Sequence, residues 1–145
     1  MSTRAIVAYV SSPGQWKGTW NHWNGEPQHL GQELIDRVAT FDGDMERLVR
    51  QYVDRCPEGW SDFREGTRSE DPVGFVHGKL RADGASSVDD GIGLDTHYVY
   101  VFDLATRTLA VFNTSTAPVA AFGRVVFDSS GNPTPSHLPA IEELP

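Results

Sequence analysis

Residues 4–10 constrain the fold more than any other stretch of this 145-residue chain. From Ala5 to Val10 the side chains are apolar at successive positions, so an extended chain here is apolar on both faces. Such a strand is stable when other strands lie on both sides of it and both of its faces are covered. We therefore expect this segment to lie in the middle of a β-sheet.

Two hairpins are predicted from period-two patterns. Residues 4–10 are followed by the turn sequence Ser-Ser-Pro-Gly and then by residues 15–23, which form the expected return strand. Residues 97–103 carry the clearest alternating pattern in the chain, and after a short turn residues 108–112 provide their partner. Shorter candidate strands lie at residues 73–80 and 125–127.

Two amphipathic helices are expected between these hairpins. The first begins near Pro27, a residue suited to a first helical turn, and carries an apolar stripe at helical spacing: Leu30, Leu34, Ile35 and Val38. The second starts after Asp44 and ends before Pro57. The segment between residues 57 and 72 is polar, with Trp60 and Phe63 as anchors to the core.

These elements predict an α+β fold: a mostly antiparallel sheet made from two hairpins, with a pair of helices on one face. Residues 1–128 form the expected single domain, and residues 129–145 form a Pro-rich C-terminal tail. A single cysteine, Cys56, excludes an intrachain disulfide. Neither a secretory signal nor a membrane-spanning stretch is recognisable, so we expect a soluble cytoplasmic protein.

The net charge of −8 argues against binding to a nucleic-acid backbone. Twelve acidic residues lie between residues 26 and 72, and a Gly- and Asp-rich loop at residues 81–95 carries four aspartates. Its four aspartates, for which we predict contact with a basic protein partner, are Asp83, Asp89, Asp90 and Asp95. Two alternatives are a solvated acidic face and a cation site.

The passage from the first hairpin into the first helix contains the densest group of unusual side chains. The predicted ligand-binding residues there are Trp20, His22, Trp23, Asn24 and His29. A helix N-terminus offers unpaired amide donors, and aromatic rings beside them would suit a flat anionic ligand such as a nucleotide. The alternative is that these side chains only fix the strand-to-helix turn.

Signals for catalysis or for a metal ion are weak. No histidine or carboxylate pattern has ligand spacing, so neither a metal site nor a cofactor is predicted. Ser2 or Thr3 could act as an N-terminal nucleophile if Met1 were removed. Cys56 has no catalytic partner signature around it.

The segment from His22 to Gly31 resembles a motif of a loosely defined family of short, uncharacterised proteins from bacteria, phages and plasmids. Those proteins open with Met-Ser-Thr-Arg, as this chain does, and contain a stretch similar to His-Trp-Asp-Gly-Tyr-Pro-Glu-His-Leu-Gly. This chain departs from the motif at Asn24, Glu26 and Gln28, where an aspartate, an aromatic residue and a glutamate are commoner. The resemblance implies no established activity.

We therefore expect a small acidic binding module, related to a phage or mobile element, that engages a ligand or a protein partner. An inhibitor or sequestering protein acting on a host system would fit this description. One alternative is a hydrolase that uses an N-terminal nucleophile or His22 with nearby carboxylates. Another is a structural or assembly component of a phage.

Overall fold

The computed structural model describes residues 3–69, 74–80, 86–88, 96–113 and 120–134. The helical elements are η1 (Pro27–Gly31), α1 (Gln32–Thr40), α2 (Met45–Val49) and η2 (Arg50–Asp54). The first five strands are β1 (Ala5–Ser12), β2 (Gln15–Asn21), β3 (Trp60–Asp62), β4 (Thr67–Arg68) and β5 (Val76–Leu80). The remaining strands are β6 (Ser86–Val88), β7 (Tyr98–Asp103), β8 (Thr108–Asn113), β9 (Ala120–Phe127) and β10 (Pro133–Thr134).

Strand β1 lies in the interior of the sheet, as its sequence predicts. It pairs with β2 on one side and with β7 on the other. Its first four residues, Ala5–Ala8, are completely buried. Because side chains alternate along a strand, these four contribute to apolar clusters on both faces of the sheet. The prediction of a central strand with two apolar faces is confirmed.

The sheet is mixed, which corrects the expectation of a mostly antiparallel sheet built from two hairpins. Its strands run in the order β10-β9-β8-β7-β1-β2-β3-β4, with β5 and β6 branching from β2. Both expected hairpins form, but β1 joins them by parallel pairing with β7, and β2 is parallel to β3. Local periodicity indicates a strand without giving the direction of its neighbour, so the sequence could not supply this part of the topology.

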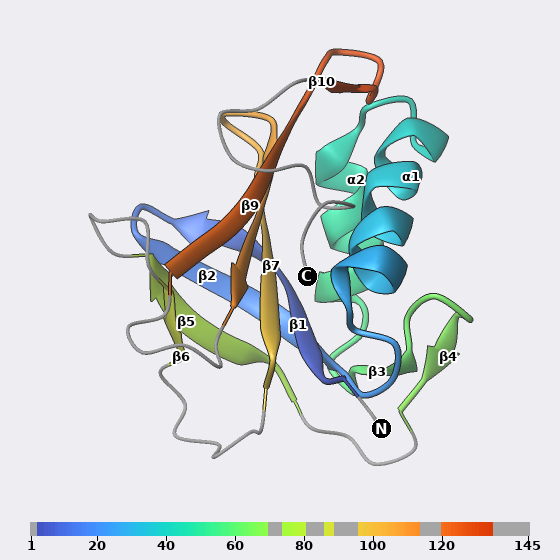
Figure 1. Ribbon diagram of the computed structural model, residues 1–145, viewed down its shortest axis with the longest axis vertical. Coiled ribbons are helices and arrows are strands. Elements are labelled where there is room, and N and C mark those ends of the chain that lie inside the picture. Colours follow the sequence, from blue (N-terminus) through green and yellow to red (C-terminus); the bar gives the residue numbers. More distant parts are fainter. Residues whose placement is uncertain (1–2, 70–73, 81–85, 89–95, 114–119, 135–145) are drawn as a thin grey trace.

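The helices lie together against one face of the sheet (Figure 1). The predicted stripe of the first helix faces the core, with Leu30, Leu34, Ile35 and Val38 all buried. Helix η1 continues directly into α1, and α2 into η2, so each pair occupies one predicted helix. Trp60 and Phe63 are buried in the same cluster, which confirms them as anchors. The α+β class is therefore confirmed.

A second apolar cluster covers the face of the sheet that turns away from the helices. Its fully or nearly fully buried members are Ile6, Ala8, Trp16, Trp20, Val76, Val99, Val101 and Phe112. Strand β5 contributes Val76 because it pairs with the first half of β2, whereas β3 pairs with the last residue of β2. The same edge of β2 is thus shared between two strands.

Four strands went unrecognised in the sequence because they are too short to show a period. Strands β3 and β4 lie in the polar segment 57–72, β6 lies in the predicted loop 81–95, and β10 lies in the predicted tail 129–145. Each is two or three residues long and depends on pairing with a longer strand. In the described part of the chain, no helix is both long and apolar enough to cross a membrane.

Candidate functional site

The corner, residues 20–31, is the passage from β2 into η1, and it is held on both sides by other segments. The backbone N–H of His22 donates to Trp60 O at 3.1 Å and that of Trp23 donates to Ser61 O at 2.9 Å, so contact with β3 continues beyond the end of β2. Gly25 N–H donates to Thr3 O at 2.9 Å. The backbone of the corner is therefore fixed between β3 and the segment preceding β1.

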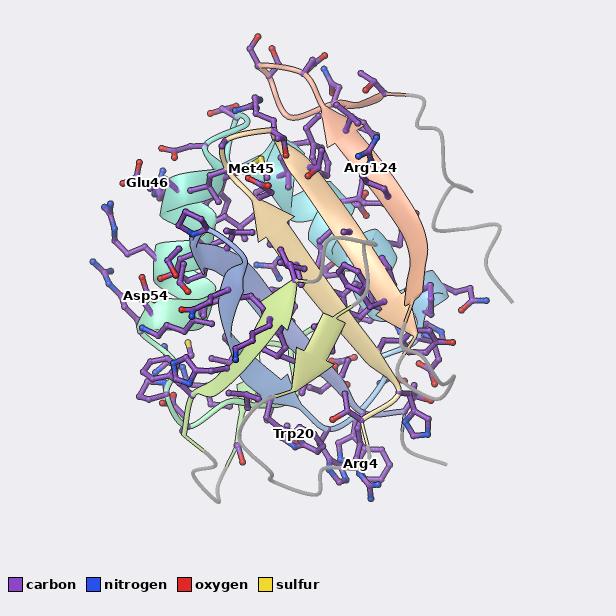
Figure 2. The ribbon with its side chains drawn as sticks, turned by 90° about the vertical axis from the view of Figure 1, so that its left-hand side faces the viewer. Arg4, Trp20, Met45, Glu46, Asp54 and Arg124 are labelled. Carbon is purple, nitrogen blue, oxygen red and sulfur yellow. The ribbon has the colours of Figure 1, made fainter. Side chains whose placement is uncertain are left out.

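Trp20 belongs to the core. Its side chain is 8% exposed and packs in the cluster on the face of the sheet away from the helices. Figure 2 shows Trp20 and Arg4 near each other at one end of the molecule, with Glu46 of α2 at the opposite end. A ring buried to this extent contributes to packing, so the expectation that Trp20 faces a ligand finds no support.

Trp23 has the opposite environment. Its side chain is 46% exposed, and among the described residues it is the large hydrophobic side chain that faces solvent. The ring of His22 meets it edge-on, with the ring centroids 4.6 Å apart and an interplanar angle of 78°. Within the described part of the chain, the His22 imidazole makes no hydrogen bond or ion pair. The structure thus brings these two predicted residues together at the surface.

The side chain of Asn21 holds the backbone beneath Trp23. Asn21 is completely buried, and its Nδ2 donates to Trp23 O at 2.8 Å. Its Oδ1 accepts a hydrogen bond from the backbone N–H of Phe63, also at 2.8 Å. The buried Asn21 amide is hydrogen-bonded at both its nitrogen and its oxygen. Breaking either bond would leave a buried polar group unpaired, at a cost in free energy, so the amide fixes the two backbone groups that it contacts. Sequence reasoning missed this role of Asn21.

Asn24 makes a structural contact at the sharpest point of the corner. Its φ is 57°, in the left-handed region that asparagine tolerates better than most residues. Its Nδ2 donates to Asp62 Oδ2 at 2.8 Å, while Asp62 Oδ1 accepts from the backbone N–H of Arg64 at 3.1 Å. An ionised aspartate, the commoner residue in the resembled motif, could not donate this hydrogen bond. Asn24 therefore ties the corner to the end of β3.

Three amide donors at the start of η1 are used within the chain. The backbone N–H groups of His29, Leu30 and Gly31 all donate to Glu26 O, at 2.9, 2.9 and 3.4 Å. Pro27 has no N–H group. These pairings weigh against an anion site based on unpaired amides.

The carboxylate of Glu26 lies beside the same helix start. It accepts a hydrogen bond from the Thr3 hydroxyl, and its Oε2 lies 3.1 Å from Nδ1 of His29. Burial would raise the pKa of Glu26, but hydrogen bonds from Thr3, its own backbone and His29 outweigh burial and lower it. His29, with 44% of its side chain exposed, is thus a hydrogen-bond partner of Glu26.

The N-terminal nucleophile stays a prediction, because Ser2 lies outside the described residues. The Thr3 hydroxyl is described only as a hydrogen-bond donor to the Glu26 carboxylate. Cys56 is poorly suited to catalysis. Its thiol is completely buried, and its pKa is raised mainly by that burial.

Tyr100 supports the corner from the sheet below. Its hydroxyl donates to Gly25 O at 2.6 Å, and its side chain is completely buried. Burial, followed by the nearby Tyr98 and Glu26, raises the pKa of Tyr100 well above its ordinary value, so it remains a donor. The sequence placed Tyr100 on a strand but gave no signal that it reaches a residue 75 positions earlier.

The predicted partner-binding residues Asp83, Asp89, Asp90 and Asp95 lie outside the described residues, so their role stays a prediction. Within the described ranges, no group of three or more His, Cys, Asp or Glu residues is placed to hold a metal ion. An open depression of about 530 Å³ is lined by the β1–β2 turn, Leu80 and residues 103–105, at the end of β1 remote from the corner.

No protein-family model, curated protein or solved structure matches this chain. The case for a function therefore depends on the geometry of the corner.

Proposed function

We propose that the protein is a non-catalytic binding module that recognises a protein partner through Trp23 and His22 at the corner. The observation that carries this proposal is that Trp23 is 46% exposed on a backbone fixed by hydrogen bonds from β3 and from Asn21. Tryptophan is enriched among the residues that dominate binding energy at protein interfaces. A fixed backbone lowers the entropy lost when a partner covers the ring.

A single exposed apolar side chain is not by itself a binding site. Trp23 differs from an incidental surface residue because a completely buried asparagine holds its carbonyl and β3 holds its N–H. The edge contact with His22 also limits the orientations of the ring. The Trp23 ring is therefore exposed to solvent while specific contacts fix both its backbone and its edge.

A protein partner is favoured over a small anionic ligand. The amide donors of His29, Leu30 and Gly31 are used within the chain, and the Glu26 carboxylate adds negative charge at the same place. The net charge of −8 also disfavours an anion and favours a partner whose surface is neutral or basic.

The alternative functions have less support from the described residues. A hydrolase that uses His22 needs a polar group to orient the imidazole, and no described residue supplies one. A particle component would be expected to present an extended apolar surface. Among large hydrophobic side chains in the described part of the chain, the exposed one is Trp23.

The proposal is tested by comparing variants in partner capture from a lysate of the native cells. We expect Trp23→Ala to lose the captured protein, and Trp23→Phe to retain most of it because an aromatic ring is kept. The control is Glu46→Ala, an exposed position at the opposite end of the molecule, which should capture as well as wild type (Figure 2). Equal capture by Trp23→Ala and wild type would contradict the proposal.

The same variants test the inhibitor hypothesis if the captured protein is an enzyme. Inhibition should then fall in parallel with capture across the series.

A further inference from the structure

The open depression at the end of β1 remote from the corner has the size of a ligand site. Its volume is about 530 Å³, within the range of roughly 300–1,000 Å³ that is usual for small-ligand sites in proteins. The β1–β2 turn, the end of β5 and the start of the β7–β8 turn form it together. Its apolar lining side chains are Val10, Pro13, Leu80 and Leu104.

The walls of the depression continue the apolar face of the sheet that turns away from the helices. Because side chains alternate along a strand, Val10 lies on the same face of β1 as Ala8. Leu80 lies in the same way on the face of β5 that carries Val76. Val10 and Leu80 pack at the margin of the second apolar cluster and are only partly buried. The depression therefore offers apolar side chains that are still partly open to solvent.

The carboxylate of Asp103 adds a negative charge beside these walls. Asp103 follows Val101 by two positions on β7, so its side chain lies on the same face of the sheet. Its Oδ1 accepts hydrogen bonds from the backbone N–H groups of Ala105 and Thr106, at 3.1 and 3.4 Å. Within the described part of the chain, its Oδ2 makes no hydrogen bond or ion pair. The depression thus combines apolar walls with one carboxylate oxygen that is available to a cation.

We propose that this depression binds a lysine side chain of a partner protein. The methylene stem of a lysine would lie against the apolar walls, and its ammonium group would donate to Asp103 Oδ2. An arginine fits less well, because its planar guanidinium is held best by both oxygens of a carboxylate and Oδ1 is already used by the turn. The net charge of −8 favours a positively charged occupant over an anion.

A second copy of this chain is a less suitable partner. The chain has two lysines, Lys17 and Lys79, and both already interact within it. Lys17 Nζ donates to Asp54 Oδ1 at 3.1 Å, and this bond would have to break before the amine could enter another depression. Two copies that each carry a net charge of −8 also repel each other. The lysine is therefore expected from a different protein.

An NMR titration of the full chain with three blocked tripeptides tests the proposal. The lysine peptide, acetyl-Leu-Lys-Leu-amide, should give saturable shifts of the backbone amide resonances of Val10, Gly14 and Leu104. The analogue with norleucine in place of lysine keeps the apolar stem without the charge. It should bind about threefold more weakly, the effect of losing a solvent-accessible ion pair. The arginine analogue should also bind more weakly than the lysine peptide, because Asp103 offers one free oxygen.

Asp103→Asn removes the charge but keeps Oδ1 as the acceptor for Ala105 and Thr106, so the turn should be preserved. It should weaken binding of the lysine peptide by about threefold and leave the norleucine peptide unchanged. The matched control is Asp36→Asn, the same charge change at an exposed position of α1, on the opposite face of the sheet. It should alter binding by less than about 1.5-fold, because salt screens distant charges.

Three results would overturn the proposal. The first is the absence of saturable shifts around the depression with the lysine peptide. The second is binding of the norleucine or arginine peptide at least as tight as that of the lysine peptide. The third is an equal loss of binding in Asp103→Asn and Asp36→Asn, which would indicate attraction to the net charge alone. Trp23→Ala should leave peptide binding unchanged, so a failure here is distinguishable from a failure of the proposed function.

Discussion

Trp20 and Trp23 lie three residues apart in the same ribbon and have opposite environments. Trp20 lies on β2, opposite Ile6 of β1, and is 8% exposed. Trp23 lies just beyond the end of β2 and is 46% exposed. The two residues are chemically identical, so the difference comes from the surrounding chain. The Trp20 ring packs in the cluster on one face of the sheet, whereas the Trp23 ring stays partly in solvent, with its backbone held by hydrogen bonds and one edge contact to His22.

The largest expected effect is on stability at Trp20. Trp20→Ala should lower the free energy of unfolding by about 3–5 kcal/mol, because it removes a buried aromatic ring from the core. Trp23→Ala should change it by less than about 0.5 kcal/mol, as is usual for an exposed position. Urea denaturation of both variants measures the contrast. Similar losses would remove the distinction between the two tryptophans.

The next effect tests whether Asn21 holds the corner. Asn21→Ala should lower the free energy of unfolding by about 2–3 kcal/mol, because the Trp23 carbonyl and the buried Phe63 N–H lose their partner. The control is Asn132→Ala, an exposed asparagine whose loss should cost less than about 0.5 kcal/mol. If the proposed function is correct, Asn21→Ala should also weaken partner capture under conditions where the variant remains folded.

A smaller difference in stability distinguishes two roles of Asn24: its left-handed backbone conformation and its side-chain hydrogen bond. Asn24→Ala and Asn24→Gly both lose the hydrogen bond to Asp62. Only alanine is strained at φ 57°, so it should be less stable than glycine by about 1 kcal/mol. Thermal unfolding of the two variants gives the difference. Equal stability would mean that the corner relaxes to another conformation.

The smallest effect is the pH dependence contributed by Glu26. Its pKa is lowered in the folded protein, so its ionised form stabilises the fold above its ordinary pKa of 4.5. This contribution is lost as the pH falls through the lowered folded value. The stability advantage of wild type over Glu26→Gln should therefore shrink on acidification. Denaturation curves at several pH values measure it, and an advantage independent of pH would contradict this role.

Long elements were predicted well because their patterns reflect burial. Strands β1, β2, β7 and β8 and both helices follow apolar periods that arise when one or two faces are covered. Strands β3, β4, β6 and β10 have too few residues for a period, and pairing with neighbours creates them. The parallel pairing of β1 with β7 joins segments more than 90 residues apart, beyond the reach of local patterns.

The sequence indicated the corner as a segment but not the contacts that hold it. The density of Trp, His and Asn residues indicated the corner, and the structure keeps His22 and Trp23 together there. The residues that support it are Thr3, Asn21, Asp62 and Tyr100. Apart from Asn21, they come from segments distant in sequence, so spacing within the motif could not indicate them.

The sequence by itself determined which apolar residues of this protein are buried away from water. A strand apolar on both faces had to be central, and a helix with one apolar stripe had to cover a sheet, because apolar burial follows directly from side-chain chemistry. Tertiary structure decided which of two identical rings was buried. Exposure at the corner depends on where β3 meets β2 and on which hydrogen bonds distant segments supply, and these are properties of the assembled chain.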